Sequence, residues 1–251
     1  MTIQQNSTKK IAIFVEGMTE FIFVSHFLKT ITEYKVNIEA LELHKDQLRK
    51  SIVGGIDFNN PISTIQFLII KVGNDEKVLS AISERARGLK DKGYNNILGL
   101  RDMYSEAYKK KSPGQVNSAI TNSFIDIAKE TIEDMGFTSL QIDIFFSIME
   151  IEAWFLATWE IFEAINSTHT KGYIENTLGI DLNNLEKYFR PFLEIKKIIL
   201  VYNKKERQVK DIVSRINKAL IDNVINENRC PAYSDFICKI QNLIAYQRHD
   251  N

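Results

Sequence analysis

Short apolar runs alternate with amphipathic stretches over most of the chain. Apolar runs bounded by polar or turn residues predict strands, and an apolar residue every three or four positions predicts a helix. The predicted strands are 10–15, 36–43, 65–72, 96–100 and 140–146, and the predicted helices are 19–31, 75–92, 116–135 and 150–165. Strands that alternate with helices predict an α/β fold with a mostly parallel sheet flanked by helices.

Two segments refine this pattern. The run 65–72 (IQFLIIKV) is nearly all apolar, as expected of a central strand that is covered on both faces. The segment 104–115 (YSEAYKKKSPGQ) is polar and contains a Pro-Gly break, which predicts a loop. This predicted loop begins two residues after Asp102.

The pattern changes after Asn166. The rest of the chain is helical in period, apart from a candidate strand at 198–202. We therefore predict an α/β domain over residues 1–166 and a helical C-terminal extension over 167–251. Because no Pro/Gly/Ser-rich linker separates them, we expect the extension to pack on the first domain.

Composition narrows the class of protein. The 251 residues include 32 basic and 32 acidic side chains, so any contact with a polyanion must be local. The two cysteines, Cys230 and Cys238, have no disulfide or zinc spacing. No run approaches the length of a membrane span, and the polar N-terminus does not resemble a signal peptide. We expect a cytoplasmic protein without membrane contact; a homo-oligomer stays open.

Acidic residues stand where predicted strands end. Glu16 follows the strand 10–15, and Asp102 follows the strand 96–100 by two residues. Ligands of an open parallel sheet bind beyond the carboxyl ends of its strands, so both carboxylates belong to that edge. Glu20 lies in the first turn of the next helix, where the helix dipole alone also favours an acid. Crowded carboxylates repel, and oxygen donors favour Mg²⁺ or Mn²⁺ over zinc.

The residues around Glu16 resemble a known family. The run from Ile11 to Glu20 (IAIFVEGMTE) resembles the opening motif of Toprim domains, and Ile97 to Asp102 (ILGLRD) resembles their second acidic strand end. This resemblance implies a fold that gathers carboxylates around Mg²⁺ to act on nucleic-acid phosphates, as in topoisomerases, primases and OLD-type nucleases. It further implies that Glu16 and Glu20 are catalytic, and that Glu16 and Asp102 hold Mg²⁺ or Mn²⁺.

One position departs from the family pattern. Toprim proteins usually have Asp-x-Asp at the second strand end, whereas here Tyr104 stands two residues after Asp102. Either Glu106 or the pair Glu150 and Glu152 completes the metal shell, or the site is degenerate and does not catalyse. The sequence leaves these alternatives open.

Two further segments are similar to small stand-alone Toprim-like proteins of bacteria, several of which are linked to phage defence. They are 147–157 (SIMEIEAWFLA) and 229–233 (RCPAY). The first implies that Glu150 and Glu152 belong to the metal site. Acids at a helix start are also favoured by the helix dipole, so a structural role is the alternative.

Two groups of basic residues are candidates for gripping a phosphate backbone. Lys109, Lys110 and Lys111 lie in the predicted loop after Asp102, and the second group includes Lys204 and Lys205. Charge runs in loops are often only solvated, which is the competing interpretation.

The leading hypothesis is a Mg²⁺-dependent Toprim-type nuclease that cleaves nucleic-acid phosphodiesters, with a role as an anti-phage effector implied by the resemblance. The alternative is a catalytically degenerate Toprim module that binds a partner ATPase or nucleic acid. Tyr104, in place of the second aspartate, is consistent with this alternative. A small-molecule phosphotransfer enzyme ranks last, because the chain has no Gly-rich phosphate loop.

Overall fold

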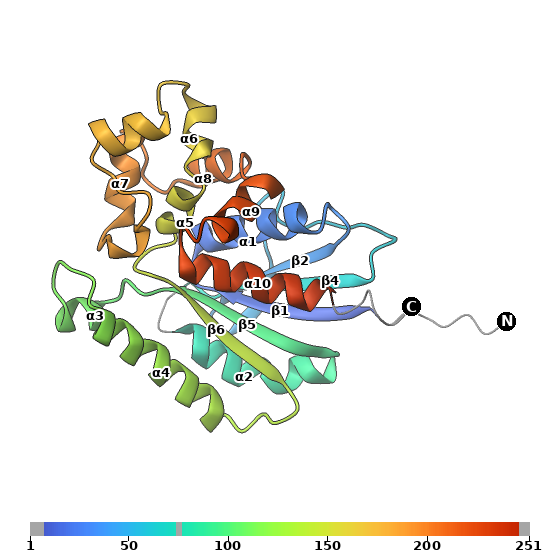
Figure 1. Ribbon diagram of the computed structural model, residues 1–251. Coiled ribbons are helices and arrows are strands. Elements are labelled where there is room, and N and C mark those ends of the chain that lie inside the picture. Colours follow the sequence, from blue (N-terminus) through green and yellow to red (C-terminus); the bar gives the residue numbers. More distant parts are fainter. Residues whose placement is uncertain (1–7, 74–76, 246–251) are drawn as a thin grey trace. The chain divides into compact units, whose positions relative to one another are not determined.

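The computed structural model describes residues 8–73 and 77–245 (Figure 1). In chain order the regular elements are β1 (Lys9–Val15), α1 (Met18–Ile31), β2 (Asn37–His44), β3 (Gln47–Lys50), β4 (Ile65–Lys71), α2 (Val78–Asp91), β5 (Tyr94–Asp102), α3 (Glu106–Lys111), α4 (Ser118–Asp134), β6 (Gln141–Ser147), α5 (Glu152–Ala157), α6 (Glu160–Ile165), the π-helix η2 (Tyr173–Thr177), the 3₁₀-helix η3 (Leu185–Lys187), α7 (Pro191–Ile198), α8 (Glu206–Val213), α9 (Lys218–Asn226) and α10 (Pro231–Ala245).

The six strands form one sheet in the order β3-β2-β4-β1-β5-β6. β1 pairs in parallel with both β4 and β5, and β2 pairs in parallel with β4. The short edge strand β3 runs antiparallel to β2. The sheet is therefore mostly parallel and flanked by helices, which confirms the predicted α/β class.

Within the described residues, contacts divide the chain into two compact units. Unit 1 comprises the chain up to Leu100 together with Ala128–Ile144, and unit 2 comprises Arg101–Ile127 together with the chain from Phe145 onward. Neither boundary coincides with the predicted division at residue 166, which stays a prediction.

Unit 1 has an apolar sheet covered on both faces. Every residue from Ile11 to Val15 is fully buried. Ala12 and Phe14 share one core cluster with the apolar residues of α2, while α1 contacts β4. In Figure 1, α1 and α2 lie on opposite sides of β1 and β4. Burial on both faces explains why these strands are apolar runs rather than alternating ones.

Unit 2 is built around α5. This helix contacts α7 and η3, and the Trp154 ring stacks on Tyr233 of α10 with centroids 4.7 Å apart. The buried Arg229 donates to the Ala157 carbonyl at 3.0 Å and pairs with Glu160 at 2.8 Å. The described chain after residue 166 is helical, as predicted, and these contacts attach it to α5 and α6.

The segment 104–115 was predicted to be a loop, and this is wrong, because α3 forms within it. Ser105 caps the helix by accepting a hydrogen bond from the Tyr108 N–H at 3.2 Å. The Tyr108 ring is fully buried, and its hydroxyl donates to the Asn117 carbonyl at 3.1 Å. These contacts hold a short helix that the polar composition concealed.

Three other local predictions differ from the structure. The predicted helix 150–165 is two helices, because the Thr158 hydroxyl donates to the Phe155 carbonyl at 3.1 Å and helps to end α5. The candidate strand 198–202 is absent: within residues 8–73 and 77–245 the last strand is β6, and Leu200 and Val201 are 80% and 75% exposed. The strand β3 was missed because all of its residues are exposed.

Candidate functional site

Asp102 is the last residue of β5, and its carboxylate joins two strand ends. One oxygen, Oδ1, accepts hydrogen bonds from the Ser147 hydroxyl at the end of β6 and from the Ile151 N–H at 3.0 Å. The backbone repeats this link, since the Met103 N–H donates to the Ser147 carbonyl at 3.0 Å. Two donors on one oxygen fix the orientation of the carboxylate. Carboxylates that bind metal ions are held by hydrogen bonds from neighbouring groups in the same way.

Glu150 and Glu152 follow β6 and are buried in unit 2, with 4% and 0% of their surfaces exposed. Glu150 accepts the Phe192 N–H at 3.0 Å, and Glu152 accepts the Tyr202 hydroxyl at 2.9 Å. The preceding residue, Met149, has a φ of 66°, a left-handed conformation that a bulky residue rarely adopts. Strained backbone of this kind gathers at functional sites.

Lys204 supplies the positive charge between these two carboxylates. Its ammonium nitrogen lies 2.8 Å from Glu152 Oε2 and 3.2 Å from Glu150 Oε1. Arg190 Nε is a more distant partner, 3.8 Å from Glu150 Oε2. Lys204 also has a left-handed φ of 58°. We call Asp102, Glu150, Glu152 and Lys204 the strand-end cluster.

Burial and charge act in opposite directions on the pKa values of Glu152 and Lys204. Burial raises the pKa of Glu152, and the nearby Lys204 opposes this effect. For Lys204, burial alone would lower the pKa, but the carboxylates of Glu152, Glu150 and Asp102 outweigh it and raise the pKa above its ordinary value. Lys204 is therefore charged at neutral pH and compensates the buried acids.

The strand-end cluster fits a divalent cation only in part. Its oxygen donors suit Mg²⁺ or Mn²⁺ in kind. The Lys204 ammonium already lies against both glutamates, so Glu150 and Glu152 do not fit a metal ion as they stand. Among the described residues, no group of three or more His, Cys, Asp or Glu side chains is arranged to hold a metal. Asp102 has its carboxylate oriented by the two donors on Oδ1.

Glu16 and Glu20 belong to unit 1. The Glu16 N–H donates to the Leu100 carbonyl at 3.2 Å, so Glu16 lies at the carboxyl end of β1 beside β5. Glu20 is buried, and its Oε2 accepts the Gly17 N–H at 2.9 Å, which caps α1. This capping role accounts for an acid in the first turn. The catalytic roles of both residues stay predictions, as does their assembly with Asp102.

The remaining predicted residues lie at the surface of unit 2. Glu106, at the start of α3, forms an ion pair with Lys109, and its side chain is largely exposed. Lys111 lies over the Phe124 ring at 5.1 Å. Lys110 and Lys205 are exposed. Thus the structure gives Lys204 a role beside buried acids, while nucleic-acid binding by the other lysines stays a prediction.

Sequence reasoning did not connect Lys204 and Tyr202 with the two glutamates. The contacts join positions 50 or more residues apart, and no spacing rule links such positions. The only local signal was the basic pair at 204 and 205. For Ser147 the signal was its place at the end of a predicted strand, where the segment 147–157 begins.

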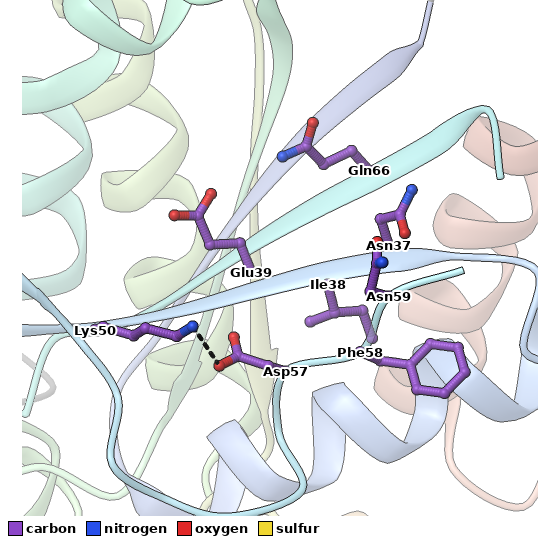
Figure 2. A pocket seen from close by; sticks show the side chains of 8 residues that line it. All are labelled: Asn37, Ile38, Glu39, Lys50, Asp57, Phe58, Asn59 and Gln66. Atoms are coloured by element: carbon purple, nitrogen blue, oxygen red, sulfur yellow. Dashed lines mark ion pairs between the residues drawn. The ribbon is translucent and has the colours of Figure 1, made fainter. Parts of the chain in front are cut away.

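A separate hollow of about 400 Å³ lies in unit 1 and contains none of the predicted site residues (Figure 2). Two of its polar side chains already serve the fold: Asp57 accepts the Ala40 N–H at 2.7 Å, and Asn37 accepts the Asn60 N–H at 2.7 Å. Lys50 pairs with Asp57 at 3.7 Å. These bonds attach the segment around Phe58 to β2, so we assign the hollow to the packing of that segment.

Comparisons with known proteins give one similarity. No protein-family model and no curated protein matches the chain. Among solved structures, the chain is similar to the C-terminal region of the OLD protein of Xanthomonas campestris pv. campestris, in a structure phased with iodine. The sequence identity is 15%, the TM-score is 0.40, and the match covers 95% of this chain and 97% of that one. The same region phased with mercury gives 12% identity and a TM-score of 0.37, with 92% and 97% covered. At these scores the similarity contributes nothing to the assignment of a function.

No helix within the described residues is both long and apolar enough to cross a bilayer.

Proposed function

We propose that this chain is a Toprim-like, divalent-metal-dependent nuclease that hydrolyses nucleic-acid phosphodiesters. The observation that carries the proposal is the strand-end cluster, in which buried acids and a lysine meet where β5 and β6 end. Active sites gather buried charged groups whose pKa values are shifted by burial and by charge partners, so such a cluster is a candidate functional site. The carboxyl end of a mostly parallel sheet is also where such folds bind ligands.

The residues proposed to hold the metal are Asp102 and Glu16. Both are proposed because the resemblance of the sequence implies them as ligands, and each stands at or just after a strand end, Glu16 after β1 and Asp102 at the end of β5. When bound, the ion supplies an activated water and charge stabilisation for the leaving oxygen. Glu20 and Glu106 remain candidates for completing the shell, and Glu150 or Glu152 could join it only if Lys204 moved away.

The chain's own residues set the electrostatics of such a site. A phosphate is an anion, and a group of uncompensated carboxylates would repel it. Lys204 reduces this obstacle, because its single positive charge offsets part of the negative charge of Glu150 and Glu152. The donors on Asp102 Oδ1 keep its carboxylate in one orientation, which limits the reorganisation needed when substrate arrives.

The second candidate is a degenerate Toprim module that binds a partner ATPase or nucleic acid without cleaving it. Two observations favour it: Tyr104 stands where the family usually has a second aspartate, and an ammonium lies between the two later glutamates. An anti-phage role suits either candidate and rests on the resemblance of the sequence alone.

Cleavage assays separate the two candidates. Purified protein is incubated with single-stranded DNA, duplex DNA, tRNA or messenger RNA in the presence of Mg²⁺ or Mn²⁺, with and without chelator. We expect cleavage that stops with chelator and falls by several orders of magnitude in Glu16→Gln, which removes the charge but keeps the shape. Glu33→Gln, an exposed control in unit 1, should cleave like the wild type.

No cleavage of any substrate, with Mg²⁺ or Mn²⁺, would favour the degenerate module. Cleavage that persists unchanged in Glu16→Gln would mean that the active site lies elsewhere.

A further inference from the structure

Aromatic rings and cations alternate on unit 2 next to Glu150. The Tyr104 ring has Lys109 Nζ and Arg190 Cζ each 4.8 Å from its centroid. Phe189 meets the same ring edge-on, with centroids 5.5 Å apart and an interplanar angle of 73°. All four side chains are half-exposed. We call Tyr104, Lys109, Phe189 and Arg190 the Tyr104 platform.

The Tyr104 platform is anchored to the rigid part of unit 2. The Tyr104 N–H donates to the Met149 carbonyl at 2.7 Å, directly before Glu150. Arg190 precedes Pro191, the first residue of α7, and its Nε lies 3.8 Å from Glu150 Oε2. The rings therefore hold a fixed place beside the strand-end cluster.

Lys109 is held only weakly in the Tyr104 platform. A cation over an exposed ring gains little energy, and the ion pair of Lys109 with the exposed Glu106 also contributes little in water. Arg190 Nε is a buried nitrogen with no hydrogen-bond partner among the described residues. Lys109 can therefore turn towards an incoming anion at small cost, which also uncovers the Tyr104 ring on the side of Lys109, while Arg190 stays beside Glu150.

We propose that the Tyr104 platform binds single-stranded nucleic acid, with an unpaired base stacked on Tyr104 and the adjoining phosphate held by Lys109 and Arg190. Aromatic rings within a basic surface are how proteins bind single strands without sequence preference, because every base has a stacking face. The inference deepens the proposed nuclease function by naming the form of the substrate. Binding itself requires neither a metal ion nor cleavage.

The aromatic residues of the Tyr104 platform favour the binding of single-stranded over duplex nucleic acid. Inside a duplex the base faces are covered by neighbouring pairs, so only phosphates are available to a surface of this kind. Lysines alone would suffice for that contact. Tyr104 and Phe189 add affinity only when a base is unpaired, and Tyr104 lies two residues after Asp102, so a stacked base would be close to the strand-end cluster.

Fluorescence anisotropy with labelled oligonucleotides tests the proposal. The full chain is titrated in chelator against single-stranded DNA and RNA and against duplexes of the same length. We expect tighter binding of single strands than of duplex, a loss of about tenfold in Tyr104→Ala, and most of the affinity retained in Tyr104→Phe. Tyr173→Ala, which removes an exposed ring of unit 2 outside the platform, should match the wild type.

A charge variant gives an independent measurement if Tyr104→Ala does not fold. Lys109→Gln changes a surface residue of α3, and it should reduce the slope of log affinity against log salt by about 0.7 for single strands. The proposal is overturned if the wild type binds no oligonucleotide, binds duplex as tightly as single strands, or is unaffected by both Tyr104→Ala and Lys109→Gln. Strand binding without cleavage in Mn²⁺ would refute the nuclease and leave this inference standing.

Discussion

The two units of this chain bury different kinds of side chain. Unit 1 encloses an apolar sheet, and Glu20 is its one buried charged residue among those described. Unit 2 buries Glu150, Glu152 and Arg229, each with partners 42 or more residues away in the chain. Unit 1 therefore depends on hydrophobic burial, whereas unit 2 depends in addition on matching distant charges.

This difference has an energetic consequence. Removing part of an apolar side chain loses burial in proportion to the volume removed. Removing one member of a buried ion pair leaves the other charge in the interior without compensation, which is strongly destabilising. Charge substitutions should therefore affect unit 2 far more than unit 1.

The largest expected effect is that of Lys204→Met. The substitution leaves Glu150 and Glu152 buried without the ammonium that lies 3.2 and 2.8 Å from them, and it should lower the free energy of unfolding by about 3–5 kcal/mol. Urea denaturation measures this. The adjacent, exposed Lys205→Met is the matched control and should change stability by less than about 0.5 kcal/mol. Equal effects would contradict the proposed role of Lys204.

In unit 1, stability depends on whether there is room for an added side-chain atom. A Cβ on Gly99 of β5 would lie 2.5 Å from Ile144 Cδ1 and 3.1 Å from Ile82 Cδ1, so Gly99→Ala should cost about 1–3 kcal/mol through overpacking. A Cβ on Gly88, within α2, would meet no atom within 4 Å, and Gly88→Ala should instead stabilise by up to about 1 kcal/mol. Thermal or urea unfolding of the two variants gives the signs, and a stabilised Gly99→Ala would show that β5 packs more loosely.

The pH dependence of the Lys204→Met variant provides a sharper test. Burial raises the pKa of Glu152 above 4.5 in the folded chain, and removing Lys204 leaves that effect less opposed. At pH values between 4.5 and the raised pKa of folded Glu152, the folded state binds more protons than the unfolded state. The free energy of unfolding should therefore rise as the pH falls, by at most about 1.4 kcal/mol per pH unit. Denaturation from pH 8 to pH 5 checks this. If the difference in free energy of unfolding between Lys204→Met and Lys205→Met does not change with pH, Glu152 is not the group responsible.

The smallest expected effect is that of Lys71→Met in unit 1. Lys71 pairs with Glu42 at 2.7 Å, but the two side chains keep 17% and 24% of their surfaces exposed. Water can solvate the remaining carboxylate, so the loss should be no more than about 1 kcal/mol by urea denaturation. A loss as large as that of Lys204→Met would remove the contrast between the units.

Unit 1 shows how much the sequence alone could predict. Burial on both faces turns strands into continuous apolar runs, which is why β1 and β4 were found close to their true bounds. The exposed β3 carries no such pattern and was missed. In unit 2, α3 depends on the Ser105 cap and the buried Tyr108, which are invisible to hydrophobic periodicity.

The candidate site was predictable only as far as its acids. Asp102 could be chosen because it follows a predicted strand end, and Glu150 and Glu152 because the segment 147–157 resembles a Glu-rich helix start. The structure brings these three together with Lys204 in unit 2. The partner of the two glutamates could not be chosen, since Lys204 lies in a different segment and looked like an ordinary surface charge. Electrostatic pairing over long sequence separations is set by tertiary packing and leaves no local pattern.

The central claim is that the carboxylate at the end of β5 holds a divalent cation. Titration of the purified chain with Mn²⁺, followed by electron paramagnetic resonance, measures this directly. We predict saturable binding that weakens at least tenfold in Asp102→Asn and is unchanged in Glu33→Gln, because only the first removes a proposed metal ligand. Absence of Mn²⁺ binding, or equal binding by Asp102→Asn and the wild type, would contradict the claim.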